Sequence, residues 1–320
     1  MHPITPYILI TAVLLDLLLG DPRRLPHPVV GIGRLISALE TILRRLVRSE
    51  LAGGALLLVG VVGSTYLLTF LLLRGACALH PYIGFAVSAW LSYTCLAARS
   101  LHHESKLVAD RLIAGDLKGA RHLLSRIVGR DTDDLTEQEI WRALVETVAE
   151  NSSDGIIAPL FYLMLGGPAL GLAYKAVNTL DSMVGYRNER YLLFGRASAR
   201  FDDLANWLPA RLTGLLMVAV APLVGLSGKE AFRMMLRDGR NHSSPNSGVP
   251  EAATAGALGV RLGGTNRYFG RPVEKPTIGD PRRDLSIESY RGAIRLMYGA
   301  MALMLLLWGT IVLFCFPSIF

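Results

Sequence analysis

Long apolar stretches alternate with polar ones along the chain. The clearest of them, residues 51–73, runs for 23 positions without Asp, Glu, Lys or Arg. Roughly 20 helical residues span the hydrocarbon core of a bilayer, so this stretch predicts a membrane helix. The same pattern predicts membrane segments at about 4–20, 51–73, 76–98, 155–178, 205–226 and 293–316. We therefore expect an all-α, polytopic membrane helical bundle that forms a single membrane-embedded domain over residues 1–320.

Two of these segments contain residues that interrupt a membrane helix. Segment 155–178 includes a Gly-Gly-Pro run, and segment 205–226 includes two prolines and Arg211. Interrupted helices occur in membranes where the backbone is buried in protein or lines a cavity. Each segment could cross the membrane completely or re-enter on one side, and both alternatives stay open. The pattern therefore predicts four to six membrane segments, some of them broken or re-entrant.

The polar connections predict different local structures. Residues 74–75 predict a tight turn between two membrane segments. The loop 99–154 is expected to be helical, because its apolar residues recur at helical spacing and Thr136 with Glu139 matches a capping box. The loop 227–290 is rich in Gly, Pro, Asn and Ser, and its second half predicts turns.

Composition and charge agree with a membrane protein. Hydrophobic residues make up 51% of the chain and charged residues 18%, below the roughly 25% that is usual in globular proteins. The net charge is +7. Lys and Arg number 6 in 21–50, 1 in 74–75 and 8 in 99–154, which predicts that 21–50 and 99–154 lie inside the cell and 74–75 outside. The side on which 179–204 lies stays open. No basic run is interleaved with aromatic residues, so nucleic acid is not expected as a partner.

A first acidic cluster precedes the segment at 155–178. Glu146, Glu150 and Asp154 recur at every fourth position, which places them on one helix face, and Asn151 lies beside them. Like-charged carboxylates repel one another unless they share a cation, and their hard oxygen ligands suit Mg²⁺. The alternative is a solvated acidic face at the start of a helix. Spacing alone leaves both interpretations open.

A second cluster ends the same segment. Lys175, Asn178 and Asp181 are spaced so that a helix presents a cation, an amide and a carboxylate together. Ionisable groups at the end of an apolar segment are costly unless they are paired or hydrated, which favours a functional role. The alternative for Lys175 is that its side chain extends to the lipid headgroups.

A third cluster combines two adjacent aspartates with an amide. Asp202 lies four residues before Asn206 and Asp203 lies three before it, so either carboxylate could share a helix face with the amide. The alternative is that the aspartates cap a helix. Arg211 follows within an apolar stretch, where it could hold a phosphate or a carboxylate through two hydrogen bonds.

The fourth cluster is a polar loop within residues 237–248, with Glu251 after it. Its hydroxyl, amide and imidazole groups make a plausible anion-binding loop, formed by His242, Ser243, Ser244 and Asn246. The segment matches neither a P-loop nor a GxGxxG fingerprint, so it does not identify a nucleotide site.

The four clusters leave two classes of function open. One is a Mg²⁺-dependent, phosphate-handling membrane enzyme, of which a prenyltransferase-like enzyme is one version, although the NDxxD spacing of such enzymes is absent. The other is a transporter whose broken segments form a solute or ion site, although the sequence has no visible duplication of two halves.

Further polar blocks accompany the clusters, and together they carry a family resemblance. The blocks with the clusters cover 16–36, 128–132, 146–161, 174–186, 198–212 and 241–280, and residues 174–186 read YKAVNTLDSMVGY. In this order they resemble the adenosylcobinamide-phosphate synthase family of cobalamin biosynthesis. The resemblance covers almost the whole chain and is weakest in 37–98 and 285–320.

The resemblance implies an ATP-dependent amide ligase. Such an enzyme joins adenosylcobyric acid, a corrinoid, to (R)-1-aminopropan-2-ol phosphate and gives adenosylcobinamide phosphate, with ATP as co-substrate and Mg²⁺ as cofactor. It also implies a multi-pass protein of the bacterial inner membrane whose reactive clusters face the cytoplasm. Other membrane enzymes of the corrinoid pathway are conceivable partners.

Within that hypothesis each cluster receives a role. The acid, base and charge-stabilising residues are Glu146, Glu150, Lys175 and Asp181. The carboxylates expected to bind metal are Asp154, Asp181, Asp202 and Asp203. The residues expected to hold substrate or phosphate are Arg130, Asn151, Asn178, Asn206, Arg211, His242, Ser243, Ser244 and Asn246. These assignments require clusters that are distant in the sequence to meet in one pocket.

Overall fold

The fold is almost entirely helical, as the sequence predicted. The structure is a computed structural model that describes residues 6–21, 27–186, 188–268 and 270–315. Contacts between these residues group the chain into two compact units. The first unit takes the described residues within 1–97, 158–206 and 312–320, and the second takes those within 98–157 and 207–311. Each unit is built from stretches that are separated in the sequence, so the two units are not consecutive domains. The single-domain interpretation stays a prediction.

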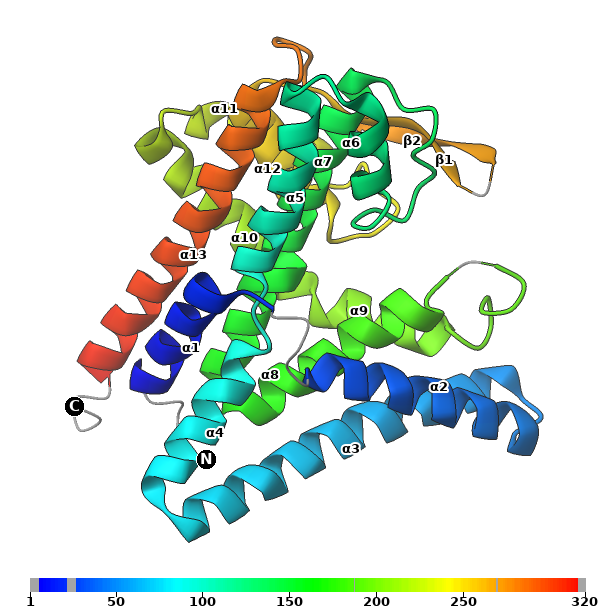
Figure 1. Cartoon of the computed structure of the whole chain (residues 1–320), viewed down its shortest axis with the longest axis vertical. Helices are drawn as coiled ribbons and strands as arrows, with labels where there is room; N and C mark the ends of the chain where they lie inside the picture. Colours follow the sequence, from blue (N-terminus) through cyan, green and yellow to red (C-terminus); the bar gives the residue numbers. More distant parts are fainter. Residues whose placement is uncertain (1–5, 22–26, 187, 269, 316–320) are drawn as a thin grey trace. The chain divides into compact units, whose positions relative to one another are not determined.

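The first unit packs around one long helix. Its helices are α1 (Pro6–Leu19), α2 (Pro28–Leu46), α3 (Glu50–Leu79), α4 (Pro81–Tyr93), α8 (Ala158–Val184) and α9 (Arg196–Ala205). α3 contacts α2, α4, α8 and α9, and Figure 1 shows α2 alongside it. Apolar side chains of α2, α3 and α8 form the core, and Phe194 from the segment before α9 joins them. Burial of such side chains is what holds these helices together.

The turn predicted at residues 74–75 is wrong. α3 continues through this point to Leu79, and the chain reverses at His80 and Pro81 instead. The His80 side chain accepts a hydrogen bond from the N–H of Tyr82, and Pro81 occupies the first position of α4. A proline is well tolerated there because its missing N–H would have no helical partner in any case. The single Arg-Gly pair was therefore a weaker signal than His-Pro.

The interruption predicted in segment 155–178 is confirmed. Gly166 and Gly167 have non-helical backbone angles within α8, and Pro168 follows them. Gly167 has a φ of 65°, which glycine adopts without the steric cost that a side chain brings. Whether the segment crosses the membrane or re-enters stays open.

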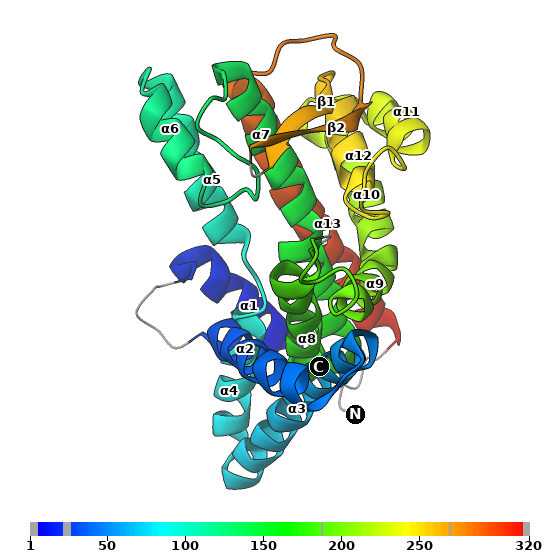
Figure 2. The same ribbon diagram turned by 90° about the vertical axis from the view of Figure 1, so that its right-hand side faces the viewer.

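The second unit contains the loop region that was expected to be helical. Residues 99–154 form α5 (Ala98–Ile113), α6 (Leu117–Leu124), α7 (Glu137–Ser152) and the start of the π-helix η1 (Ser153–Ile157). Thr136 and Glu139 form the predicted capping box at the start of α7, with both reciprocal hydrogen bonds present. The remaining helices are α10 (Trp207–Val220), the 3₁₀ helix η2 (Ala221–Val224), α11 (Gly228–Asp238), α12 (Gly248–Leu258) and α13 (Ile287–Cys315). Figure 2 shows α10, α11 and α12 close together.

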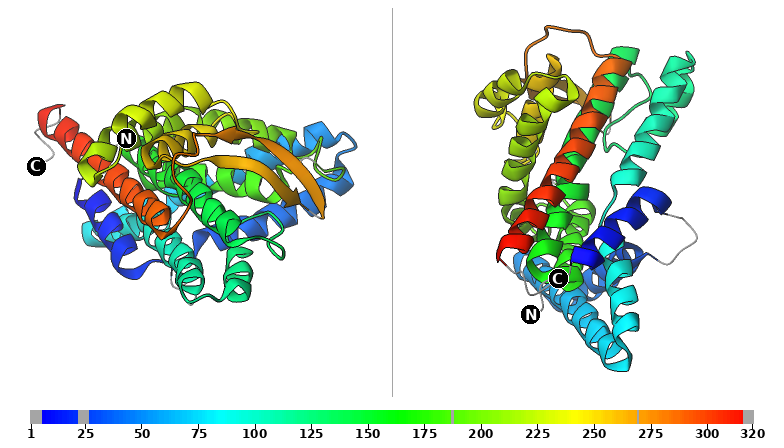
Figure 3. Two further views of the ribbon diagram at one scale, coloured as in Figure 1. Left: turned by 90° about the horizontal axis from the view of Figure 1, so that it is seen from above. Right: turned by 90° about the vertical axis from the view of Figure 1, so that its left-hand side faces the viewer.

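The prediction of turns in the second half of 227–290 is wrong for most of residues 262–278, whereas 279–286 form neither helix nor strand. The first of these stretches forms the antiparallel strands β1 (Leu262–Tyr268) and β2 (Arg271–Ile278), which the left view of Figure 3 shows beside α12. The register is irregular between Gly263 and Gly264. Glycine and proline suggested turns, but the strands also hold Thr, Tyr, Val and Ile, which favour extended backbone. Backbone pairing between the strands therefore outweighed the local turn signals.

Four helices of the described chain are long and apolar enough to cross a membrane. They are Glu50–Leu79, Glu137–Val184, Trp207–Val224 and Ile287–Phe314. α1 is apolar but has 14 residues, and α4 has 13. The predicted fold class, an all-α polytopic membrane bundle with four to six membrane segments, is therefore confirmed.

Candidate functional site

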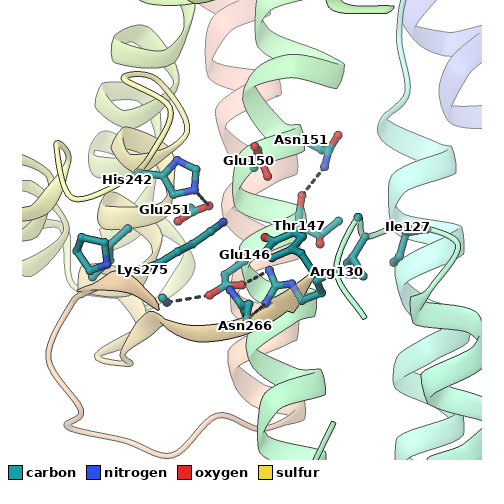
Figure 4. A pocket seen from close by; sticks show the side chains of 16 residues that line it. Ile127, Arg130, Glu146, Thr147, Glu150, Asn151, His242, Glu251, Asn266 and Lys275 are labelled. Carbon is teal, nitrogen blue, oxygen red and sulfur yellow. Dashed lines mark hydrogen bonds and ion pairs between the residues drawn. The ribbon is translucent and has the colours of Figure 1, made fainter. Parts of the chain in front are cut away.

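A charged cavity of about 220 Å³ lies within the second unit. Its walls come from the segment that follows α6, from α7, from the loop between α11 and α12, from α12 itself and from the β1–β2 hairpin. Figure 4 shows carboxylates from two helices and basic side chains from three loops or strands pointing toward one another. Five separated stretches of sequence therefore build one polar site.

Glu146 is the most tightly held carboxylate of the cavity. Its Oε2 accepts a hydrogen bond from Arg130 Nη2 at 2.5 Å, and its Oε1 accepts one from the N–H of Gly263 at 2.8 Å. Arg130 also donates to Asn266 Oδ1 at 2.8 Å. Gly263 has a φ of 76°, and a Cβ at this position would lie 2.3 Å from the carbonyl oxygen of Pro276. Only glycine therefore lets the hairpin bring its N–H to Glu146.

Glu150 lies one helical turn further along α7. Its Oε1 accepts a hydrogen bond from Ser247 Oγ at 2.9 Å, which ties α7 to the start of α12. Asn151 also lines the cavity, and its amide donates to the carbonyl of Thr147 at 2.9 Å. The predicted residues Arg130, Glu146, Glu150 and Asn151 are therefore brought together.

His242 and Glu251 form a pair on the opposite wall. His242 Nδ1 accepts the N–H of Ser244 at 3.0 Å, so the neutral ring carries its proton on Nε2, which lies 3.9 Å from Glu251 Oε1. Glu251 is only 4% exposed. Burial, and after it the carboxylates of Glu146 and Glu150, raise the pKa of Glu251 well above its ordinary value. Burial also lowers the pKa of His242. Both effects favour a neutral acid facing a neutral imidazole.

Lys275 supplies a further positive charge. It reaches into the cavity from β2, and its Nζ lies 5.6 Å from the centre of the Tyr268 ring. No carboxylate of the described residues pairs with this ammonium group within 4.0 Å, whereas the charge of Arg130 is paired with Glu146 and its second nitrogen donates to Asn266. Lys275 is therefore the basic group of the cavity that is free to meet an anion.

Asp154 does not share the wall that Glu146 and Glu150 form. It belongs to the π-helix η1, and it is not among the residues that line the cavity. The expectation of one acidic face assumed a regular α-helix, but a π-helix places more residues in each turn and so changes the direction of the side chains. The predicted stripe of three carboxylates is therefore reduced to two.

The predicted anion-binding loop is held by Arg211. Its Nη1 donates to Asn246 Oδ1 at 2.6 Å, and its Nη2 donates to the carbonyl of Pro245 at 3.1 Å. Ser244 Oγ accepts the N–H of Asn246 at 3.2 Å, while Ser243 is exposed. These contacts give Arg211 and Asn246 a role in shaping the loop that presents His242. Their predicted phosphate contacts stay predictions.

A second polar group lies in the first unit. Asn206 Nδ2 donates to Asp202 Oδ2 at 3.0 Å, and Asn206 Oδ1 accepts the hydroxyl of Tyr174 at 2.8 Å. Asp202 is therefore the aspartate that shares a helix face with Asn206. Asp203 instead lines a separate depression beside Tyr186. The sequence had left open which aspartate would do so.

Asp202 is the most perturbed carboxyl of this group. Burial, and after it the charge of Asp181, raises the pKa of Asp202 to about 7, while hydrogen bonds from Asn206 and Asn178 oppose the shift. Its Oδ1 is buried and accepts no hydrogen bond from any residue that the structure describes. Asp181, Asn178 and Lys175 project from α8 of the same unit.

The predicted residues thus form two groups, one in each unit. The charged cavity holds Arg130, Glu146, Glu150, Asn151 and His242, and the polar group of the first unit holds Asn178, Asp181, Asp202 and Asn206. The convergence of both groups on one pocket stays a prediction. Within the described residues, no three His, Cys, Asp or Glu side chains are arranged to hold a metal ion by themselves.

Several residues of the cavity had no assigned role in the sequence prediction. Four of them carry polar side chains from α12 or the hairpin, namely Glu251, Asn266, Tyr268 and Lys275. Glu251 follows the polar loop in the sequence, so its position near His242 was a usable signal. The other three lie on the hairpin, whose pairing with the rest of the cavity has no signature in local spacing.

Comparisons with known proteins give one consistent family. The family model described as CobD/Cbib protein matches residues 9–297. The cobalamin biosynthesis protein CobD of Geobacter metallireducens is 67% identical over 300 residues, covering 94% of this chain and 94% of that protein. Its namesake in Pelobacter propionicus is 62% identical, covering 92% and 91%. The cobalamin biosynthesis protein CbiB of Salmonella typhimurium is 52% identical, covering 92% and 94%. No solved structure matches the chain.

Proposed function

Because the chain belongs to the CobD/CbiB family, we propose that it acts in cobalamin biosynthesis as an adenosylcobinamide-phosphate synthase. The proposed reaction joins a carboxylate of adenosylcobyric acid to the amine of (R)-1-aminopropan-2-ol phosphate and consumes ATP. The observation that carries the proposal is the family match over residues 9–297. The charged cavity supports it, because amide formation between a carboxylate and a phosphorylated amine needs both acidic and basic groups.

The chemistry requires activation of the carboxylate. A propionate oxygen of the corrinoid attacks the γ-phosphorus of ATP, ADP leaves, and an acyl phosphate forms. The neutral amine then attacks the acyl carbon, the bond to the phosphate breaks, and inorganic phosphate and a proton are released. A base must accept one proton from the substrate ammonium before the attack can occur.

The residues of the cavity divide these tasks according to their contacts. Both oxygens of Glu146 are occupied by Arg130 and Gly263, so this carboxylate is suited to positioning the wall of the cavity. Glu150 has one oxygen bound by Ser247 and its second oxygen open to the cavity, which makes it the better candidate for a base. His242 lies opposite and stabilises negative charge through Nε2–H.

The polar group of the first unit fits a magnesium ion. The buried Oδ1 of Asp202 accepts no hydrogen bond from the described residues, and Asp181 and Asn178 act on the same carboxyl. Carboxylate and amide oxygens are ligands that Mg²⁺ accepts, with water or phosphate oxygens completing its coordination. Asp202, Asp181 and Asn178 would hold such an ion, which neutralises charge on the phosphates of ATP. Asp154 and Asp203 stay as weaker candidates.

The proposed location is the bacterial inner membrane with the reactive groups facing the cytoplasm, where ATP and the phosphorylated amine are available. A cysteine placed at Asn188, in a chain without its own three cysteines, tests this orientation in intact cells. Protection from a membrane-impermeant thiol reagent is the expected result. Labelling before the cells are opened would contradict the cytoplasmic placement.

The activity is tested with the purified chain in detergent or lipid nanodiscs. Mass spectrometry should detect adenosylcobinamide phosphate only when the corrinoid, the amine phosphate and ATP are all present. Each substrate is omitted in turn as a control. Amide formation without ATP, or no product from folded protein with all three substrates, would overturn the proposal.

A further inference from the structure

The charged cavity is small for the reaction proposed above. Its volume of about 220 Å³ lies below the roughly 300–1,000 Å³ of pockets that enclose drug-sized ligands. ATP is drug-sized and the corrinoid is much larger. The amine phosphate, with its short propanol backbone, is the one substrate of matching size.

The cavity also offers both charges that this substrate needs. Glu146 has no free oxygen, because Arg130 and Gly263 occupy its carboxylate. The groups that remain available for an ammonium are the second oxygen of Glu150 and the carboxyl of Glu251. A ligand ammonium can therefore be received between α7 and α12, the helices that carry these two side chains.

The opposite charge has a separate place. Lys275 enters from β2 and pairs with no described carboxylate, and the π-face of Tyr268 lies behind its ammonium group. Figure 4 shows its side chain extended toward Glu146 and Glu251. A phosphate bound to Lys275 would thus lie within the same small cavity as an ammonium bound to Glu150 and Glu251.

We infer that this cavity is the subsite for a small zwitterion of the aminoalkyl phosphate class, with Glu251 and Glu150 receiving the ammonium and Lys275 receiving the phosphate. The inference rests on the proposed function for the identity of the ligand. It adds two residues, Glu251 and Lys275, that determine which amine is accepted.

The electrostatics of the cavity agree with this assignment. Glu251 is 4% exposed, and its pKa is raised by burial and then by the carboxylates of Glu146 and Glu150, which together outweigh the opposing charges of Lys275 and Arg130. The charged and titratable groups that face it are Glu146, Glu150, His242, Lys275 and Arg130. A ligand ammonium adds a cation in direct contact with this carboxyl, so its binding favours the ionised form of Glu251.

Isothermal titration calorimetry on the full chain tests the inference with three ligands. They are (R)-1-aminopropan-2-ol phosphate, an analogue without the amine and an analogue without the phosphate. Glu251→Gln keeps the shape of the side chain but not its charge. It should weaken the complete ligand about tenfold or more and leave the affinity for the amine-free analogue unchanged. Lys275→Met should likewise weaken the complete ligand and leave the affinity for the phosphate-free analogue unchanged.

Two exposed residues provide matched controls. Glu274 lies next to Lys275 on the same strand and is changed to Gln, and Lys229 lies on α11 and is changed to Met. Neither control should change the affinity for any of the three ligands. Equal weakening of all three ligands by Glu251→Gln would indicate a structural role and overturn the inference. Unchanged affinity of both cavity variants for the complete ligand would overturn it as well.

The same preparation separates this inference from the proposed function. If the protein binds the amine phosphate with the expected pattern but forms no amide, the ligase proposal fails and the subsite stands. If it forms the amide while Glu251→Gln and Lys275→Met bind every ligand as the unmodified chain does, the ligase proposal stands and the subsite fails.

Discussion

Two carboxyls of the second unit are equally buried and yet have opposite properties. Asp238 and Glu251 are both 4% exposed. Asp238 accepts two hydrogen bonds from Arg237 at 2.7 Å and a third from the N–H of Gly279 at 2.7 Å. These bonds, those from Arg237 above all, lower the pKa of Asp238 despite its burial. Glu251 faces two other carboxylates and an imidazole 3.9 Å away, and its pKa is raised.

Asp238 and Glu251 differ in their hydrogen-bonding and charged partners, not in how deeply they are buried. Asp238 is satisfied by the protein itself, and it fastens the end of α11 to the segment after β2. Lys275 and Arg130 act on Glu251 but neither forms an ion pair with it among the described residues, and a buried acid without such a partner is expensive for a structural residue. An acid kept in this condition is typical of a binding or catalytic site. Burial alone therefore does not distinguish a structural carboxyl from a functional one.

The largest expected loss of stability comes from removing the hydrogen-bonded cation of Glu146, so that this carboxylate becomes more like Glu251. Arg130→Met removes the closer of the two arginines that pair with Glu146, and the side chains of Arg130 and Glu146 are 10% and 6% exposed. Removal of one partner from a buried ion pair costs about 3–5 kcal/mol, and the loss should lie at the lower end of this range because Arg142 remains 3.9 Å from Glu146. Chemical unfolding in detergent measures the loss. A loss below about 1 kcal/mol would show that the pair behaves as an exposed one.

A smaller loss is expected for Asp238→Asn. The variant keeps the shape of the side chain but loses charge-assisted hydrogen bonds, which contribute about 1.5–3 kcal/mol. Since the pKa of Asp238 is lowered on folding, its contribution is present above the ordinary carboxyl pKa of about 3.9 and is lost as the pH falls through the folded value. Thermal unfolding from pH 7 to pH 3 should therefore show the variant and the unmodified chain converging at the acid end. A constant difference across this range would refute the assignment.

The smallest expected effect has the opposite sign. Because the pKa of Glu251 is raised on folding, the unfolded chain ionises near pH 4.3 while the folded chain keeps the proton, and stability falls as the pH rises above that point. A glutamine at this position does not titrate, so the melting temperature of Glu251→Gln should rise relative to that of the unmodified chain between pH 5 and 8. Glu274→Gln is the control and should show no such trend. If the stability of Glu251→Gln relative to the unmodified chain falls with rising pH instead, Glu251 behaves as Asp238 does.

The parts of the fold that depend on near neighbours could be predicted. The capping box of Thr136 and Glu139 and the break at Gly166–Pro168 appear where the sequence places them, because each depends on residues within one helical turn. The turn at His80 and the β1–β2 hairpin were missed. At His80 the cap and Pro81 start a new helix and outweigh the Arg-Gly signal, and in the hairpin pairing between the strands outweighs the local turn signals.

The candidate site was only partly predictable for a related reason. Spacing along α7 identified Glu146 and Glu150 as neighbours on one face, but it could not foresee that η1 would turn Asp154 away. The contacts that complete the cavity join residues far apart in the chain, such as Glu150 with Ser247 over 97 positions and Glu146 with Gly263 over 117. No periodicity in a sequence records such distances.

The sequence by itself determined that this protein is a polytopic helical membrane protein and that its acidic, amide and basic residues gather in a few polar blocks, because apolar length and helical spacing are local properties. Only the tertiary structure decided which charges meet. It satisfied Glu146 with Arg130 and left Glu251 beside Lys275 in a cavity sized for a small ligand, since burial and long-range contacts decide which buried charges are compensated.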